Sequence, residues 1–319
     1  MIIGVDESGS FSNDSRVLLA AALMRPSAHE RIAEALQVWE RRTRVALGLT
    51  NEVKGRDLDE AASGRFVADV LRAGGDDAVV YMAFAVDVCA ENIAAMDIQR
   101  QVLMEGYHHW ADMQAQSNDP ARQRFARQLT QTEDWVGARS PRQLLKLMTL
   151  SAILPTVVEN AFGFSIAREF GGELVEFRVH LDRGYIKRSE VRFWRDLLRN
   201  IFIGETEGHP IPFSTEWAPD HPVLQTFVDQ QSGTGFVLKP TFKERIDFCD
   251  SATTPVVRLA DVITSIVRRG AHGGDLARPY RELRSLCLDR YAYKVLVWND
   301  KRRPPRPNPY LEFNTAGGL

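Results

Sequence analysis

The chain opens with a short run of apolar residues, 1–5, that stops at two acids and a Ser-Gly turn, Asp6-Glu7-Ser8-Gly9. Residues of β type in such a run predict a buried strand, and the acids at its end predict that Asp6 is delivered into a site. A core strand has no structural need of two adjacent acids, because burial of an unpaired carboxylate is costly. The opening residues therefore predict both a sheet and a place for chemistry.

The next eighty residues alternate between strand-like and helix-like patterns. Residues 16–24 are almost wholly apolar and predict a second strand. Apolar residues at helical spacing predict a helix over 28–47, and a second helix is expected to end at Gly74-Gly75. Residues 78–88 again have the composition of a buried strand, so this part of the chain is expected to be mixed α/β.

The pattern changes after residue 90, where one helix-forming segment follows another. We interpret 91–171 as a large helical insertion. Strand character returns at 174–181, directly before Asp182. The later elements are expected to be a helix over 189–202, strands near 213–217 and 236–248, and a helix from Pro255 to about residue 269. Residues 276–319 are expected to form a C-terminal extension whose tail, 301–306, is basic and rich in proline.

The composition is that of an ordinary globular protein. The chain has 319 residues, of which 44% are hydrophobic and 26% charged. Its 40 basic and 42 acidic residues nearly cancel, so binding to a polyanion would need local patches. The three cysteines lack zinc-site spacing and indicate a reducing compartment. With neither a basic, apolar leader nor an apolar run of about 20 residues, we expect a cytoplasmic protein with no membrane association.

Four acids stand out by their placement along the predicted elements. Asp6 and Asp182 end predicted strands, Glu52 follows the first helix, and Asp261 interrupts the apolar pattern of the late helix. If the two strands are neighbours, their carboxylates lie together, and a helix packed across the sheet can add Asp261. Such carboxylates repel one another, so divalent cations between them would stabilise the cluster. The expected cofactor is Mg²⁺ or Mn²⁺, and two such ions would support hydrolysis of a phosphodiester.

Each acid also has a structural explanation that the sequence leaves open. Asp6 could stabilise the Ser-Gly turn. Glu52 could pair with Lys54 at the surface, and Asp182 could pair with Arg178 or Arg183. Asp261 could pair with Arg258 one helical turn away. No single acid is a strong signal, so the prediction of a site depends on their order along the chain.

This order, together with the residues around each acid, resembles a bacterial family known only as domain of unknown function 3800, whose members are similar to ribonuclease-H-fold proteins. The matching motifs are Val5-Asp6-Glu7-Ser8-Gly9, Glu52-Val53-Lys54-Gly55, His180-Leu181-Asp182, Asp250-Ser251 and Leu259-Ala260-Asp261. They cover few residues but extend over most of the chain.

The resemblance implies an α/β fold with a ribonuclease-H-like mixed sheet flanked by helices, in which the first three strands form an antiparallel meander. The core would comprise 1–90 and 172–275, interrupted by the large helical insertion 91–171. The resemblance also implies that Asp6, Glu52, Asp182 and Asp261 are catalytic metal ligands, with Lys54 as a phosphate contact and Asp250 as an outer ligand. The implied activity is that of a divalent-metal-dependent nuclease that hydrolyses DNA or RNA by a two-metal mechanism.

Two features depart from this pattern. Arg258 stands where we expect a glutamine before Leu-Ala-Asp, and an arginine one turn from Asp261 could neutralise it. The helical insertion is larger than a minimal fold requires. We expect it to carry substrate selection or an interface, either with a second copy of the chain or with a protein partner.

A basic segment directly after Asp182 is a candidate surface for nucleic acid. Its members are Arg183, Lys187, Arg188, Arg192, Arg195 and Arg199, and positions 188, 192, 195 and 199 share one face of the predicted helix. Most contacts of a protein with nucleic acid are made to phosphates, which such a stripe can bind. The alternative is a solvated face that is partly neutralised by Glu190 and Asp196.

Other functional classes fit the sequence less well. A phosphatase that uses Asp6 as nucleophile would usually have a second Asp two residues on, where this chain has Ser8. An actin-like ATPase would need a second, duplicated domain, and a Ser/His/Asp hydrolase would need a Gly-x-Ser-x-Gly setting. The main alternative is a non-catalytic binding or regulatory subunit that keeps the ribonuclease-H fold.

Overall fold

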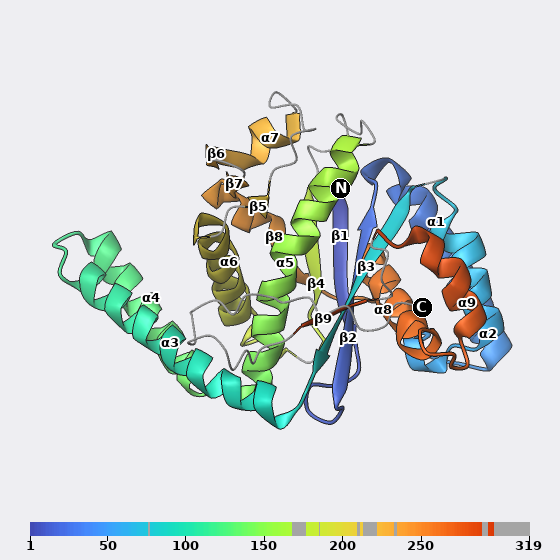
Figure 1. Cartoon of the computed structure of the whole chain (residues 1–319), viewed down its shortest axis with the longest axis horizontal. Coiled ribbons are helices and arrows are strands. Elements are labelled where there is room, and N and C mark those ends of the chain that lie inside the picture. The colour runs from blue at the N-terminus through green and yellow to red at the C-terminus, as the bar shows by residue number, and fades with distance from the viewer. Residues whose placement is uncertain are drawn as a thin grey trace.

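A mixed sheet forms the centre of the protein, as the computed structural model shows (Figure 1). The structure describes residues 1–75, 77–167, 177–184, 186–208, 211–212, 222–232, 235–288 and 293–296. The main sheet contains six of the described strands in the order β8-β4-β1-β2-β3-β9. Their bounds are β1 Ile2–Ser8, β2 Arg16–Met24, β3 Val79–Asp87, β4 Arg178–Asp182, β8 Ile246–Cys249 and β9 Lys294–Leu296.

The first three strands form an antiparallel meander, and the other strands run parallel to their neighbours. β1 therefore lies inside the sheet, between β2 and β4, with Ile2 opposite Arg178 and Val5 opposite Leu181. The predicted meander is confirmed, and β2 has the bounds that the apolar run 16–24 predicted. Because β2 is covered on both faces, its residues from Val17 to Met24 are all buried.

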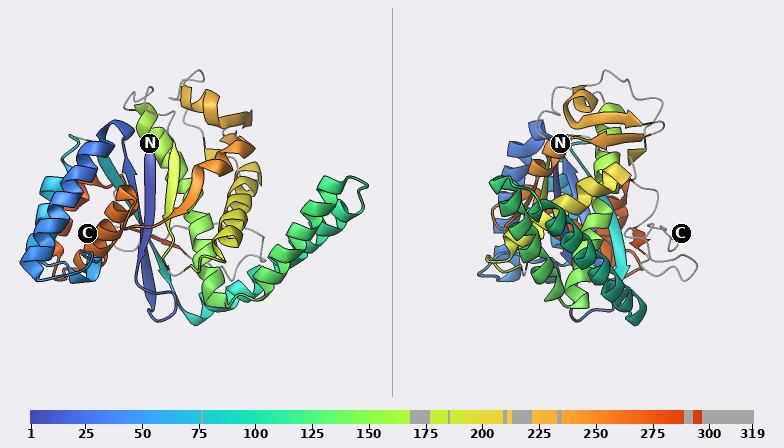
Figure 2. Two further views of the ribbon diagram at one scale, coloured as in Figure 1. Left: turned by 180° about the vertical axis from the view of Figure 1, so that it is seen from behind. Right: turned by 90° about the vertical axis from the view of Figure 1, so that its left-hand side faces the viewer.

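Helices cover both faces of the sheet (Figures 1 and 2). One face packs against α1 His29–Leu47, α8 Pro255–Gly270 and α9 Ala277–Leu283, together with α2 Glu60–Arg65 and the π-helical turn Phe66–Leu71 that continues it. The other face packs against α5 Pro141–Ala167 and α6 Val191–Gly208. Two apolar cores result, one on each face, which is the layered arrangement that buries both sides of a sheet.

The helical stretch after β3 has two structurally different parts. Helices α3 Ala90–Ala115 and α4 Pro120–Gly137 form a hairpin that projects away from the sheet (Figure 1). Helix α5, in contrast, lies on the sheet, and its apolar residues belong to the same core as β1, β2 and β3. Among the described residues, Pro141–Ile166 is the one helix long and apolar enough to cross a membrane, but most of it is buried inside the protein, as in the core helix of a globular domain.

Several later elements differ from the sequence pattern in detail. The apolar stretch 236–248 is divided into β7 Gly235–Leu238 and β8 by a 3₁₀ helix, Pro240–Arg245. A small second sheet has the order β5-β7-β6, with β5 Ile211–Pro212 and β6 Val228–Ser232, and α7 Pro222–Phe227 precedes β6. The start of the expected strand 174–181, the expected strand 213–217 and the tail 301–306 lie outside the described residues. Three further 3₁₀ turns are Pro26–Ala28, Gly55–Asp57 and Arg284–Leu286.

The C-terminal extension begins as part of the main fold. Helix α9 packs against α8 and buries Tyr280 and Leu283. Strand β9 then adds to the free edge of β3, with Val295 opposite Ala85. The described residues 277–288 and 293–296 thus complete the sheet and one of its helical layers.

The sheet and its helical layer approach each other closely where α8 crosses β1. A Cβ atom added to Gly4 would lie 2.3 Å from the backbone oxygen of Val256, well inside any real contact. Only glycine lets the helix backbone approach the strand this closely. The contact is on the face of β1 that also carries Asp6, because side chains at alternate positions of a strand share a face.

We predict that Gly4→Ala lowers the free energy of unfolding by about 1–3 kcal/mol, the usual effect of overpacking a tight core contact. Denaturant unfolding followed by circular dichroism would measure the change. Gly64→Ala in α2 is the control, since an added Cβ there meets no atom within 4 Å. It should raise stability by about 0.5–1 kcal/mol, as expected for a helical glycine. Equal stability of Gly4→Ala and the wild type would contradict the close packing.

Candidate functional site

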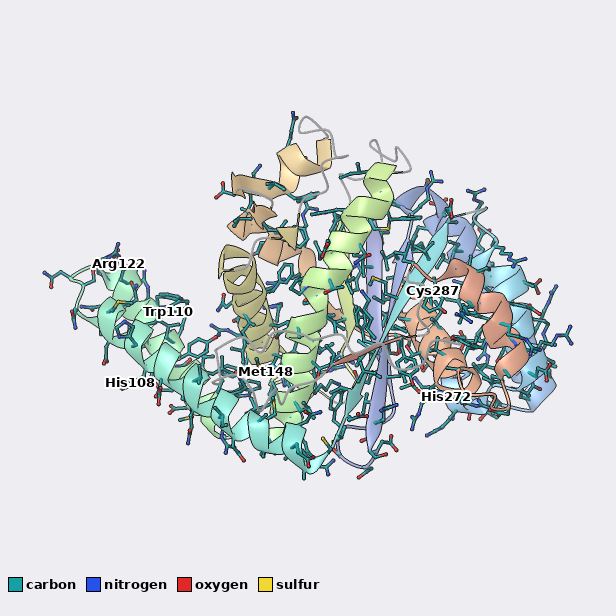
Figure 3. All side chains as sticks on the ribbon, viewed as in Figure 1. His108, Trp110, Arg122, Met148, His272 and Cys287 are labelled. Atoms are coloured by element: carbon teal, nitrogen blue, oxygen red, sulfur yellow. The ribbon has the colours of Figure 1, made fainter. Side chains whose placement is uncertain are left out.

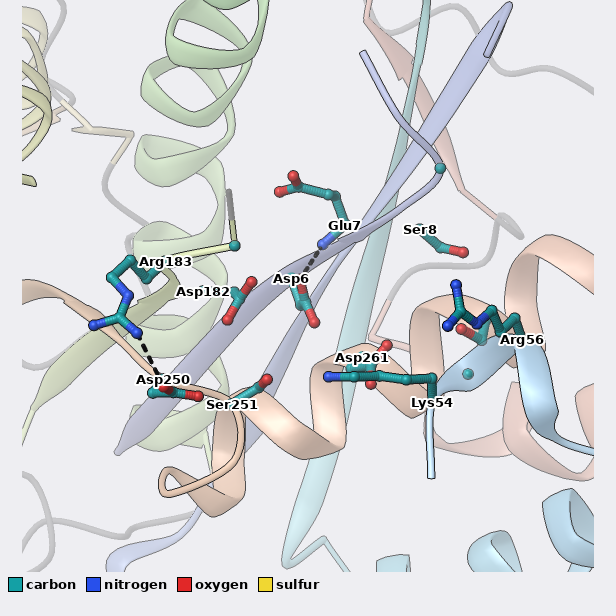
Figure 4. A pocket seen from close by; sticks show the side chains of 14 residues that line it. Asp6, Glu7, Ser8, Lys54, Arg56, Asp182, Arg183, Asp250, Ser251 and Asp261 are labelled. Atoms are coloured by element: carbon teal, nitrogen blue, oxygen red, sulfur yellow. Dashed lines mark hydrogen bonds and ion pairs between the residues drawn. The ribbon is translucent and has the colours of Figure 1, made fainter. Parts of the chain in front are cut away.

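A pocket of about 450 Å³ lies where β1 and β4 end (Figure 4). Three segments that are distant in sequence contribute one aspartate each, namely Asp6, Asp182 and Asp261. The other lining residues are Glu7, Ser8, Gly9, Lys54, Gly55, Arg56, Arg183, Gly184, Asp250, Ser251 and Ser265. All five matching sequence motifs therefore contribute residues to one hollow.

Asp6 and Asp182 are brought together by the register of two parallel strands. Val5 pairs with Leu181, so the next residues of β1 and β4 are neighbours and project to the same face of the sheet. The carboxylate of Asp6 accepts a hydrogen bond of 2.7 Å from the backbone N–H of Glu7, and Asp6 is only 7% exposed. Figure 4 shows Asp182, Asp6 and Asp261 grouped in the pocket, with Glu7 directed away from them.

The electrostatic environment of these aspartates opposes ionisation. Burial raises the pKa of Asp6 well above its ordinary value, and the charges of Asp261, Asp182 and Glu7 raise it further. Burial also raises the pKa of Asp182 to about 6, with Glu7 as the largest charged contributor and Lys146 acting in the opposite direction. Asp6 therefore lies within the electrostatic range of Asp182 and Asp261, whose charges oppose its ionisation.

Asp261 comes from the middle of α8 and differs from the other two in having a cationic partner. Burial raises its pKa, while the charges of Arg258 and Lys54 lower it. Arg258 Nη1 lies 2.6 Å from Asp261 Oδ2, across one turn of the helix. Asp261 therefore forms the ion pair with Arg258 that was its structural alternative, and it also lines the pocket.

Arg258 joins α8 to the loop that carries the Glu52 motif. Its side chain is 3% exposed, and its Nη1 lies 2.9 Å from Glu52 Oε1. Its Nη2 donates to the backbone oxygen of Val53 and lies 3.8 Å from Glu40 Oε1. One buried guanidinium thus fixes the loop at the position from which Lys54 and Gly55 enter the pocket.

The loop also approaches α8 directly. A Cβ on Gly55 would overlap Ser265 Oγ at 1.7 Å, and Arg269 Nη1 donates to the Gly55 backbone oxygen at 3.2 Å. The glycine of the Glu-Val-Lys-Gly motif is required by this contact. Because the loop packs on α8, Lys54 and Gly55 line the same pocket as Asp261, although they are distant in sequence.

Glu52 does not line the pocket with the three aspartates. Its Oε1 faces Arg258, and its Oε2 lies 2.5 Å from Lys54 Nζ. Glu52 still lies close enough to Asp261 to raise the pKa of that carboxyl group. The predicted pair with Lys54 is present, and the assignment of Glu52 as a metal ligand stays a prediction.

Positively charged groups surround the acidic part of the pocket. Lys54 is 45% exposed and Arg56 is 86% exposed, so both can contact a molecule in the pocket. Arg183 Nη2 donates to Asp250 Oδ2 at 3.0 Å on the opposite side (Figure 4). One structural alternative for Asp182 was an ion pair with Arg183. The structure instead pairs Arg183 with Asp250.

The basic stripe after Asp182 lies elsewhere. Helix α6 begins at Val191, and neither Lys187, Arg188, Arg192 nor Arg195 lines the acidic pocket. Arg192 lines a separate hollow between α4 and α6 and lies 3.6 Å from Asp196. Arg195 lies 3.8 Å from both Asp196 and Asp247. Asp196 thus partly neutralises this face, whereas Glu190 pairs with Arg139 at 2.9 Å.

Lys146 and Arg56 belong to the site but were missing from the sequence prediction. Lys146 lies on α5, forms a partly buried ion pair with Glu7, and lowers the pKa of Asp182. The signal that could have found it is a single cation in the apolar sequence Leu144-Leu145-Lys146-Leu147. A lysine at such a position needs an acidic partner inside the protein.

The donor set fits a hard divalent cation in its chemistry. The charges of Asp182 and Asp261 raise the pKa of Asp6, which is buried with no cationic partner at hydrogen-bonding distance among the described residues. Oxygen ligands of this kind suit Mg²⁺ and Mn²⁺. Within the described ranges, no three His, Cys, Asp or Glu side chains are already close enough together to hold an ion. An ion would therefore have to draw these carboxylates together.

Comparison of the chain with protein-family models, curated proteins and solved structures finds no match. The geometry described above is thus the basis for a functional assignment.

The raised pKa of Asp182 predicts a pH-dependent effect of Asp182→Asn. A carboxyl whose pKa is raised on folding stabilises the protein below its ordinary pKa, and this contribution is lost as the pH rises through about 6. In a chelator, the Tm of Asp182→Asn minus that of the wild type should therefore increase between pH 4 and pH 7. We expect an increase of about 3 °C, the effect of about 1 kcal/mol in a large domain. Parallel curves would contradict the shift.

Removal of the buried guanidinium should be strongly destabilising. We predict that Arg258→Met lowers the free energy of unfolding by about 3–5 kcal/mol, because two acids lose their buried partner. Arg278→Met is the control: Arg278 is 70% exposed and lies 3.9 Å from Glu60, so its loss should cost under about 1 kcal/mol. Urea unfolding measures both changes. Similar values for the two variants would show that Arg258 does not fix the loop.

Proposed function

We propose that this chain is a divalent-metal-dependent nuclease with a ribonuclease-H-like core, and that its pocket hydrolyses a phosphodiester bond of DNA or RNA. The observation that carries the proposal is the meeting of Asp6, Asp182 and Asp261 in one pocket that also contains Lys54, Arg56 and Arg183. Acids grouped in the interior and cations at the margin suit a metal ion and a phosphate group, respectively.

The arrangement of the sheet supports the fold assignment. The meander β1-β2-β3 with β4 and β8 parallel beyond β1 agrees with the expectation from the resemblance to domain of unknown function 3800. The first strand supplies Asp6 from inside the sheet, and a late helix, α8, supplies the final acid. All five matching motifs contribute an acid or a lysine to the pocket.

Asp6, Asp182 and Asp261 would hold Mg²⁺ or Mn²⁺, with Glu52 completing the set if it exchanges its partners. When bound, such ions supply activation of water and stabilisation of the leaving oxygen. Lys54 and Arg56 would bind the phosphate from one side of the pocket and Arg183 from the other. Arg258 would position the loop that carries Lys54, and the Glu7–Lys146 pair would fix the end of β1 beside Asp182.

One observation favours a second candidate, a non-catalytic binding or regulatory subunit. Arg258 neutralises Asp261 at 2.6 Å, and the same guanidinium occupies Glu52. Two of the four proposed ligands are thus engaged by a buried cation. A subunit that keeps the fold but binds nucleic acid without cleaving it would tolerate this arrangement.

A cleavage assay separates the two candidates. Single- and double-stranded DNA and RNA are incubated with the wild type, Asp6→Asn and Asp182→Asn, in Mg²⁺, in Mn²⁺ and in a chelator. We expect metal-dependent cleavage by the wild type and a loss of at least about 100-fold in each variant, because each removes a charge that would hold the ion. The preferred substrate identifies the type of nucleic acid.

Asp87→Asn is the matched control. Asp87 also ends a strand of the sheet, β3, but pairs with Arg16 away from the pocket, so cleavage should stay near the wild-type rate. Equal activity in the wild type, Asp6→Asn and Asp182→Asn would remove the nuclease proposal. Nucleic-acid binding without cleavage by any purified form would favour the non-catalytic subunit.

A further inference from the structure

The projecting hairpin α3–α4 has an apolar surface that its own helices leave uncovered. Helix α3 packs on α4, and its buried residues include Met96, Tyr107 and Ala111. A second set of residues shares another face of α3 at helical spacing: Ile98, Val102, Gly106, Trp110 and Met113. We call this set the α3 stripe.

The α3 stripe is open to solvent along much of its length. Ile98 is 43% exposed, Trp110 51% and Met113 46%, and Val102 is half-buried. All three are among the exposed large hydrophobic residues of the part of the chain that the structure describes. Figure 3 shows Trp110 on the part of the hairpin that extends beyond the body of the protein, with Arg122 near its tip.

Gly106, in the middle of the α3 stripe, has no structural role within one copy of the chain. A Cβ added there would meet no atom within 4 Å, and its backbone φ is not positive. A glycine inside a helix lowers helix stability by about 0.5–1 kcal/mol relative to alanine. A small residue between larger apolar ones is suited to the close approach of another helix.

The charges along the hairpin indicate what covers the α3 stripe. The half nearest the sheet, residues 91–105 and 130–139, contains five acids and two arginines. The outer half, residues 106–129, contains three arginines, Arg122, Arg124 and Arg127, against two aspartates. A second hairpin laid antiparallel would place each basic tip beside an acidic base. This is the self-complementarity that a two-fold interface requires.

We propose that the α3 stripe is the interface between two copies of this chain, whose α3 helices pack antiparallel against each other. Helix α3 has 26 residues and is about 39 Å long, so the contact can extend over several helical turns. Burial of Ile98, Trp110 and Met113 along this contact supplies the apolar area, and Gly106 in the middle lets the helices approach.

Sedimentation of the full chain at concentrations from about 1 to 100 μM tests the proposal. We expect a dimer for the wild type and a monomer for Trp110→Lys/Met113→Lys, with unchanged circular dichroism. Val45→Lys is the control, since Val45 is an 85% exposed apolar residue on α1, on the other side of the sheet. It should stay dimeric. A monomeric wild type, or a double variant that is still dimeric, would overturn the proposal.

Two further variants keep the test independent of misfolding. Gly106→Ala should raise the Tm of the monomer but weaken dimerisation by about tenfold or more, a combination that a purely structural glycine would not give. Reversal of Arg122, Arg124 and Arg127 to Glu should also weaken the dimer by at least about tenfold, because acidic tips would then face acidic bases. An unchanged dimer in the charge-reversed variant would exclude the antiparallel arrangement.

Discussion

The absence of a side chain at Gly4 lets helix α8 lie directly on strand β1, and the position of the other site residues depends on that contact. With the helix at this distance, Asp261 reaches the pocket that Asp6 and Asp182 share. The same helix carries Ser265 and Arg269, which hold the Gly55 turn, and Arg258, which holds Val53. β1, α8 and the loop at Gly55 thus form one packed unit. Addition of a methyl group at Gly4 would push α8 away from β1 and so separate Asp261 from Asp6.

The charges of this unit are only partly balanced. On the helix side, one buried guanidinium faces Glu40, Glu52 and Asp261. On the other side of the sheet, Lys146 compensates Glu7. Asp6 lies between these pairs and has only a backbone N–H at hydrogen-bonding distance among the described residues, so its pKa is raised by burial and by its acidic neighbours. Burial of such an acid without a cationic partner is costly for packing, and this cost is one reason for our proposal that Asp6 holds a ligand.

The sequence was sufficient where a residue's environment is set by its own element. β2 was predicted with its observed bounds because both of its faces are covered, and the grouping of Asp6 with Asp182 follows from two strands that end together. Prediction from the sequence was insufficient where the position of a residue depends on contact with an element distant in the chain. Glu52 is turned toward Arg258, which comes from a helix about two hundred residues later, and β9 is a three-residue strand whose pairing with β3 has no local signal. The role of Lys146 likewise depends on α5 lying over the end of β1.

Helix α5 connects the two surfaces to which we assign functions. Its first turns follow the hairpin directly, and Arg142 donates to the backbone oxygen of Phe11 at 2.7 Å, in the turn between β1 and β2. One turn later, Lys146 pairs with Glu7 beside the pocket. The base of the hairpin is therefore fixed to the strand end that carries Asp6. Because packed helices and sheets move as rigid units, two chains joined through their α3 stripes would hold two acidic pockets at a constant separation. An extended substrate such as a nucleic acid is long enough to contact both pockets, whereas a small molecule would occupy each one independently.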